Sequence, residues 1–144
     1  MEERTVEYWL DIAQYDLDTA EAMWQTKRWL YVAFMCHQSI EKTLKAYWSG
    51  TREDAPPYTH NLKRLADGCG LYQRMSAEQR RFIETITNYN IEARYPEDRA
   101  DIARSLTPKT CRYFIDETKE LTKWIRDEYS AATKPSASSD ATNK

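Results

Sequence analysis

Apolar residues recur every three or four positions along most of the chain, which is the period of an amphipathic α-helix. The first such segment is expected from about Thr5 to Thr26. Its apolar stripe consists of Trp9, Ala13, Leu17, Ala20 and Trp24. Asp16 falls beside this stripe, where a carboxylate usually caps a helix, meets water or pairs with a base. We expect a structural salt bridge, to a lysine of the second helix.

The second helix is predicted from Trp29 to Ser49, with Gly50 as its terminator. Residues 51–58 contain Pro56-Pro57 and are expected to form a loop. Thr59 is the predicted N-cap of a short third helix, whose apolar face and terminators follow. That face carries Leu62, Leu65 and Ala66, and Gly68 and Gly70 end the helix.

Capping signals define the remaining helices. The run from Ser76 to Gln79 is a capping box, which places the start of a fourth helix there. Its apolar positions are Phe82, Ile86, Tyr89 or Asn90, and Ala93. Pro96 is expected to end this helix at Tyr95, with a polar loop from about Glu97. Thr107-Pro108 opens the last helix, and its predicted buried stripe is Cys111, Phe114, Thr118, Leu121 and Ile125.

Four substantial helices and one short one, joined by modest loops, predict an all-α fold, an antiparallel four-to-five-helix bundle. We expect one domain over residues 1–130. Residues 131–144 are rich in Ala, Ser and Thr and have nothing to bury, so a disordered polar tail is predicted.

Composition agrees with a helical domain and restricts the partners. The 144 residues include only 3 Gly and 5 Pro, and the 5 Trp and 10 Tyr supply aromatic side chains that enlarge a small core and also favour interfaces. A formal charge of −2 argues against sequence-independent nucleic-acid binding, which needs a basic surface. A local basic pocket remains compatible with that charge.

Cysteine usage and hydropathy predict the compartment. Three widely spaced cysteines, Cys36, Cys69 and Cys111, fit a reducing cytoplasm better than a disulfide framework. The charged N-terminus lacks the apolar core of a signal peptide. The longest apolar run, Trp29–Cys36, is too short to cross a bilayer. We expect a soluble cytoplasmic protein with no membrane association.

The second helix carries the most informative polar residues. His37, Glu41 and Lys45 are spaced four apart, and Lys42 lies beside them, so all four share one side of the helix. Because this cluster adjoins strongly apolar sequence, we expect it at the edge of a core, in a dimer interface or in a ligand cleft. A solvated face with paired charges is the alternative.

Three further residues could join this cluster. His60 opens the third helix, while Arg94 and Tyr95 close the fourth, and with the lysines they could converge on an anion such as a nucleotide phosphate. The alternatives are a helix-capping role for His60 and a pairing of Arg94 with a helix C-terminus or a nearby glutamate.

Other chemistry is poorly supported. The chain has no Cys-x-x-Cys and no His-Glu-x-x-His, and the adjacent Cys36 and His37 diverge on a helix, so we expect no metal site. His37 with Glu41 could form part of a nucleophilic triad, but no nucleophile elbow accompanies them. Gly-rich phosphate loops are absent, and we expect no cofactor.

Ordered fragments along the chain resemble the HEPN domain family of small prokaryotic helical proteins. The fragments are Tyr8-Trp9 with Ala13, Asp16-Leu17 and Ala20; His37-Gln38, Glu41-Lys42 and Leu44-Lys45-Ala46; Pro57 to Leu62 with Leu65; and Ile91 to Pro96. The resemblance covers most of the chain from Tyr8 to Trp124. It implies a bundle of four to five helices that is commonly dimeric. It also implies a partnership with a minimal nucleotidyltransferase encoded nearby, the pair behaving as a two-component or toxin–antitoxin module.

Many members of that family are metal-independent endoribonucleases, with an arginine followed after four to six residues by a histidine. The family arginine matches Arg94, but no histidine follows His60 in this sequence. Without an imidazole there, no group with a pKa near neutrality is available for proton transfer. We therefore predict a homodimeric component that binds a nucleotide or a partner and lacks ribonuclease activity. The alternatives are a ribonuclease toxin that uses a relocated histidine, His37 or His60, to cleave RNA, and a structural dimerisation domain.

Overall fold

The computed structural model describes residues 5–90 and 96–133. They form the helices α1 (Val6–Gln25), α2 (Trp29–Thr51), α3 (Leu62–Gly68), α4 (Ala77–Thr87), α5 (Pro96–Arg104) and α6 (Pro108–Thr133), with a 3₁₀ turn, η1 (Tyr72–Arg74), before α4. No strand occurs within these ranges. The predicted all-α helical bundle is therefore confirmed.

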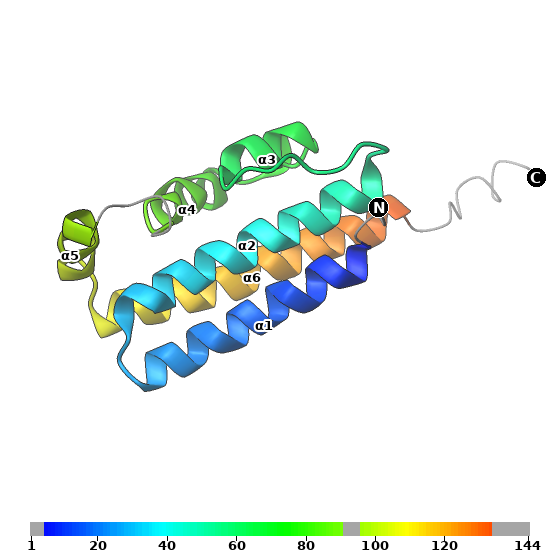
Figure 1. The fold of residues 1–144 in the computed structure, drawn as a ribbon. Coiled ribbons are helices and arrows are strands. Elements are labelled where there is room, and N and C mark those ends of the chain that lie inside the picture. The colour runs from blue at the N-terminus through cyan, green and yellow to red at the C-terminus, as the bar shows by residue number, and fades with distance from the viewer. Residues whose placement is uncertain (1–4, 91–95, 134–144) are drawn as a thin grey trace, which may run out of the picture.

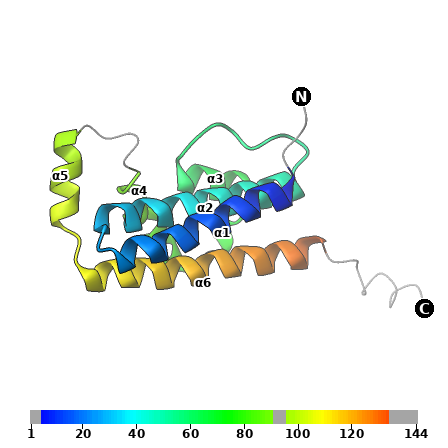
Figure 2. The same cartoon turned by 60° about the horizontal axis from the view of Figure 1, so that its bottom comes forward.

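Three long helices, α1, α2 and α6, lie side by side and form the body of the molecule (Figures 1 and 2). α1 runs opposite to both α2 and α6, whereas α2 and α6 run in the same direction. The two are parallel because the chain returns through α3, α4 and α5 before α6 begins. α3 and α4 follow one edge of α2, and α5 lies across one end of the bundle (Figure 1).

The core is built from the apolar stripes that the sequence predicts. Leu17 and Ala20 of α1 pack on the buried face of α2, and Phe114, Leu121 and Ile125 of α6 close the core from the other side. Trp24 is only partly buried, and its indole Nε1 donates to the carbonyl of Pro108 at 3.1 Å. Burial of these side chains is the main stabilising contribution to such a bundle.

Polar contacts fix how α1 sits against its two neighbours. Ser39 donates from Oγ to the carbonyl of Ala13 at 2.8 Å in the buried α1–α2 contact. On the surface, Arg112 of α6 binds both carboxylate oxygens of Glu21 on α1, at 2.9 and 2.6 Å. Lys119 adds a third contact to Glu21 at 2.8 Å. The Arg112 hydrogen bonds are the main reason that the pKa of Glu21 falls to about 2.

The predicted caps of α4 and α6 are confirmed, and α1, which was predicted to begin near Thr5, is capped by that residue. The Thr5 hydroxyl accepts from the amide of Tyr8 at 3.1 Å, and Ser76 with Gln79 forms the reciprocal capping box. The Thr107 hydroxyl accepts from the amide of Thr110 at 3.0 Å. These side chains satisfy amides that would otherwise lack a partner in the first turn of a helix.

The predicted end of the second helix is wrong. α2 continues through Gly50 to Thr51, and Arg52 is its C-cap. A Cβ atom on Gly50 would lie 2.3 Å from Cε1 of Tyr129 on α6. Gly50 therefore allows α2 and the Tyr129 ring to pack closely, and it does not act as a terminator.

The third helix begins later than predicted. Asn61, and not Thr59, is the N-cap of α3, and its side chain accepts from the amide of Arg64 at 3.0 Å. The Thr59 hydroxyl instead accepts from the amide of Asn61 at 3.2 Å, which tightens the turn before the helix. The buried face of α3 is the predicted one.

The segment after α4 also differs from the prediction. α4 ends at Thr87 and not at Tyr95, and Pro96 begins α5, whereas the sequence predicts a polar loop from about Glu97. Proline is favoured at the first helical position because the amide it lacks would have no helical partner there. α6 extends to Thr133, beyond the predicted domain boundary at residue 130. Ala93 and residues 134–144 of the predicted tail lie outside the described residues.

Candidate functional site

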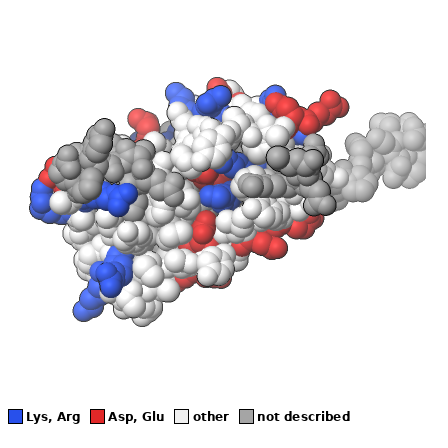
Figure 3. Space-filling model, in the orientation of Figure 1, with Lys and Arg blue, Asp and Glu red and all other residues white. Residues whose placement is uncertain are grey.

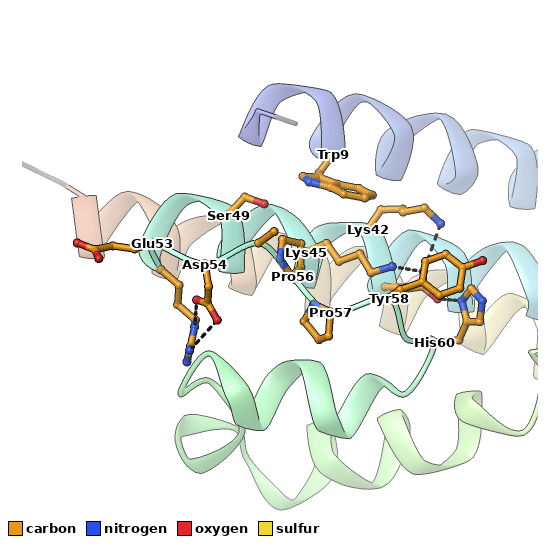
Figure 4. A pocket seen from close by; sticks show the side chains of 13 residues that line it. Trp9, Lys42, Lys45, Ser49, Glu53, Asp54, Pro56, Pro57, Tyr58 and His60 are labelled. Atoms are coloured by element: carbon orange, nitrogen blue, oxygen red, sulfur yellow. Dashed lines mark hydrogen bonds and ion pairs between the residues drawn. The ribbon is translucent and has the colours of Figure 1, made fainter. Parts of the chain in front are cut away.

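A carboxylate buried in the middle of α2 organises the polar cluster. Glu41 is only 1 % exposed. Its Oε2 accepts from Nζ of Lys45 at 3.0 Å and lies 3.5 Å from Nζ of Lys42. Its Oε1 accepts from Nδ1 of His60 at 2.8 Å (Figure 4). Both carboxylate oxygens are thus engaged by basic side chains, which is the condition under which a buried charge is tolerated.

The partners of Glu41 come from two elements: the lysines from α2 itself, and His60 from the loop that follows it. Glu41 and Lys45 are four residues apart on α2, so their side chains meet on one face. His60 comes from the segment of residues 52–61 that links α2 to α3, called here the strap. The beginning of the strap is anchored too, because the indole Nε1 of Trp48 donates to the carbonyl of Asp54 at 3.1 Å.

Arg52 strengthens that anchor. Its guanidinium binds both carboxylate oxygens of Asp54, at 2.7 and 3.0 Å, and donates to the carbonyl of Gly68 at 2.6 Å. It also stacks 4.5 Å from the ring centroid of Trp48. The strap is therefore fixed at both ends across the surface of α2.

His37 lies behind the cluster and has no exposed surface. Its Nε2 is 3.1 Å from the carbonyl oxygen of His60. A carbonyl only accepts hydrogen bonds, so Nε2 must carry the proton. Burial lowers the pKa of His37, because the charged imidazolium would lose its hydration. His37 is then a neutral residue that holds the strap in place.

Two acidic groups near the lysines have opposite pKa shifts. Burial alone would raise the pKa of Glu41, but Lys42, the hydrogen bond from His60 and Lys45 together hold it below its usual value. Burial raises the pKa of Asp16 on α1 to about 6, an effect that the charge of Lys42 opposes and that of Glu41 reinforces. Glu41 is therefore ionised at neutral pH, whereas Asp16 titrates just below it.

A cavity of about 490 Å³ opens between α2, the strap and the start of α1. Its lining includes Glu41, Lys42, Lys45 and His60 from the predicted set, together with Trp9, Ser49 and strap residues 52–58. The strap crosses in front of α2 with Tyr58 beside the lysines (Figure 4). Charged atoms of both signs gather near the middle of this face among uncharged side chains (Figure 3).

Two aromatic rings flank the ammonium group of Lys45. Nζ of Lys45 lies 5.5 Å from the ring centroid of Trp9 and 5.9 Å from that of Tyr58, within the range of a cation–π contact. The Tyr58 side chain is 94 % exposed. Cations fixed beside an exposed aromatic ring and a partly apolar wall can bind an anionic ligand that also carries a planar ring.

A family model for the HEPN domain matches residues 6–128, which is most of the chain. The chain belongs to the HEPN family. No curated protein and no solved structure is similar enough to the chain to match it. The family assignment confirms the predicted resemblance and agrees with the all-α fold, and the HEPN match includes every residue of the cavity lining.

The HEPN fold brings together only part of the predicted set. Glu41, Lys42, Lys45 and His60 line the cavity. His37 is not part of the lining and reaches it through His60 and Glu41, whose Oε1 lies 4.0 Å from the Nδ1 of His37. Arg94 and Tyr95 lie outside the described residues, so their predicted place in the site stays a prediction.

The predicted salt bridge of Asp16 to a lysine of α2 is not formed. Within the described ranges, no basic side chain lies within ion-pairing distance of Asp16, although the charge of Lys42 acts on it. The polar partners of a buried carboxylate depend on the exact rotation of two packed helices, which spacing along one helix does not specify.

Sequence analysis missed Trp9 and Tyr58 as cavity residues. The sequence predicts Trp9 in the core stripe, and the residue is buried, but it also lines the cavity. Tyr58 follows Pro56-Pro57, and an aromatic residue after two prolines in a loop was the available signal for an exposed ring.

Over residues 5–90 and 96–133, no three His, Cys, Asp or Glu side chains are grouped so as to hold a metal ion. None of the helices in that part of the chain is long and apolar enough to cross a membrane.

Proposed function

We propose that this HEPN protein binds a nucleotide in the cavity between α2 and the strap. The observation that carries this proposal is that Lys42 and Lys45 share one oxygen of the buried Glu41, at 3.5 and 3.0 Å. An ammonium group has three donors, so each lysine keeps hydrogen-bonding capacity after its contact with Glu41. The two ammonium groups would repel each other without Glu41. The carboxylate keeps both at the wall of the cavity, where they are positioned in advance to bind a phosphate.

The aromatic residues of the cavity support a nucleotide over a simple anion. A base can stack on the exposed ring of Tyr58, and stacking of a base on an aromatic side chain contributes about 1–3 kcal/mol. A cavity of about 490 Å³ also lies in the range of small-molecule sites.

At the level of biological role, we propose that the protein acts as the nucleotide- or partner-binding component of a two-gene module. The second component would be a separately encoded minimal nucleotidyltransferase, and the module would be of the toxin–antitoxin type. HEPN membership supports this proposal. In the proposed module the chain would act as a homodimer. Co-purification of the full chain with the product of an adjacent nucleotidyltransferase gene tests it, and a neighbouring gene of another kind argues against it.

A ribonuclease with a relocated histidine is the second candidate. His37 does not support it, because that side chain is buried and its Nε2 is engaged by the carbonyl of His60. The observation in favour is the pairing of His60 with a carboxylate at the edge of the cavity. Incubation of labelled RNA with the purified protein in EDTA tests it: cleavage that disappears in His60→Gln supports this candidate, and intact RNA removes it.

Isothermal titration calorimetry with adenosine and guanosine nucleotides tests nucleotide binding. Lys42 is the variant of choice because its side chain is 16 % exposed and Lys42→Gln should leave the fold intact. We expect at least a tenfold loss of affinity, about 1.4 kcal/mol. The matched control is Lys123→Gln on α6, whose lysine pairs with Asp127 on the surface. Equal affinity of the two variants and the parent would contradict the assignment.

A further inference from the structure

The charges that line the cavity limit how many phosphates its ligand can carry. The three basic residues of the lining, apart from His60, are Lys42, Lys45 and Arg52, and the three acidic ones are Glu41, Glu53 and Asp54. The formal charges of these residues cancel. The site therefore differs from a polyphosphate site, in which cations clearly outnumber carboxylates.

Existing ion pairs further reduce the positive charge that the lining can offer to a ligand. The guanidinium of Arg52 donates from Nε and Nη2 to the Asp54 carboxylate and from Nη1 to the carbonyl of Gly68, so it stabilises the strap. Lys42 and Lys45 are left to face a ligand, and Glu41 already offsets one of their two charges. The described lining thus offers an excess of about one positive charge at its inner wall.

The opposite end of the cavity is acidic and exposed. Glu53 and the Arg52–Asp54 ion pair lie at the beginning of the strap, away from Tyr58 and His60 (Figure 4), so this end carries a net negative charge from Glu53. A chain of phosphates that extended from the lysines toward this end would meet carboxylates. The charge pattern favours one phosphate at the lysines and an uncharged, hydrogen-bonding part of the ligand toward the acidic end.

We propose that the ligand is a nucleoside monophosphate, and that the lining charges discriminate against the di- and triphosphate. This inference rests on the proposed nucleotide-binding function. A single phosphate carries about −1.5 to −2 charges near neutral pH, the smallest charge in the nucleotide series, and the ammonium groups of Lys42 and Lys45 face it. Each further phosphate adds negative charge for which the lining has no free cation among the described residues.

Calorimetric titration of the full chain with AMP, ADP and ATP, and with GMP, GDP and GTP, tests the inference in EDTA at fixed ionic strength. We expect a monophosphate to bind at least tenfold more tightly than the triphosphate of the same base. Affinity that rises with each added phosphate overturns this inference alone, because the cavity would still bind nucleotides. Binding of none of the six overturns both this inference and the proposed function.

A variant that removes one negative charge from the lining tests whether these charges cause the discrimination between mono- and triphosphate. Glu53→Gln removes an exposed carboxylate from the lining, so it should raise the affinity for the triphosphate severalfold and change that for the monophosphate less. The matched control is Glu84→Gln on α4, an exposed residue of a different hollow, which should change neither affinity. Equal effects of both variants on both ligands would show that the lining charge does not discriminate.

Discussion

The imidazole of His60 donates from Nδ1 to Oε1 of Glu41 at 2.8 Å, and this contact joins the end of the strap to the middle of α2. His37 fixes the same residue from behind, through the backbone carbonyl of His60. The strap therefore depends on a carboxylate that also positions two lysines. Loss of that carboxylate should affect the fold and the cavity together.

Glu41→Gln tests this dependence. The amide cannot attract Lys45 and His60 as the carboxylate does, and a buried lysine would lose its counter-charge. Removal of one partner of a buried ion pair costs about 3–5 kcal/mol, so we expect a loss of unfolding free energy of about 2–4 kcal/mol in urea denaturation. The exposed Glu84→Gln should remain within about 0.5 kcal/mol of the parent. A Glu41→Gln variant as stable as that control would show that the cluster does not support the fold.

Asp16→Asn should stabilise the protein at neutral pH. The folded pKa of Asp16 is about 6, above its ordinary value of 3.8. The folded protein therefore holds the proton of Asp16 more tightly than the unfolded chain does. This stabilisation is fully present below the unfolded pKa of 3.8 and is lost as the pH rises through about 6, where the buried carboxyl must ionise. We expect the variant to gain about 1–2 kcal/mol at pH 7.5 and close to nothing at pH 4, after allowance for solvent near the group.

Urea denaturation of the parent and Asp16→Asn at both pH values measures this effect. Asp11→Asn, at an exposed position of the same helix, is the control and should show no such difference. The same change in stability at pH 4 and pH 7.5 would mean that burial does not perturb the Asp16 carboxyl.

Gly50→Ala should destabilise the protein although alanine is the better helix former. The new Cβ would lie 2.3 Å from Cε1 of Tyr129, whose ring is partly buried and packs edge-on to Tyr47 at a centroid distance of 6.4 Å. Overpacking of this kind costs about 1–3 kcal/mol, more than the roughly 0.5–1 kcal/mol that alanine gains in a helix. Thermal unfolding of the variant gives the net effect.

A double-mutant cycle with Tyr129→Ala separates the two contributions. In that background the clash is absent, so Gly50→Ala should become neutral or stabilising. If Gly50→Ala destabilises by the same amount with and without the Tyr129 ring, close packing against α6 is not the reason for the glycine.

Local signals were sufficient to predict most of the fold. Thr5, Ser76 and Thr107 mark helix starts because their side chains cap amides within the next turn, and this chemistry is visible in a few consecutive residues. Gly50 and Pro96 were misinterpreted because each has two structural uses. Only the approach of Tyr129 shows that Gly50 belongs inside a helix, and that contact joins residues far apart in the sequence.

The site was predictable to the extent that it lies on one helix. Glu41, Lys42 and Lys45 cluster because of helical spacing, and His60 was a candidate by its chemistry. Trp9 and Tyr58 could not be placed in the same way, since their approach to Lys45 depends on the packing of α1 and on the path of the strap. Those two rings, more than the charges, favour the proposed nucleotide site over a solvated polar face.

The most direct test of the central claim is a titration of the isotope-labelled full chain with AMP and GMP, followed by amide and indole NMR shifts. Binding in the cavity predicts progressive shifts at the Trp9 indole and at the amides of Lys45, Tyr58 and His60. The Trp24 indole, which donates to Pro108 at the other end of α1, should not move. Shifts centred away from the cavity, or no shifts with either nucleotide, would contradict the account.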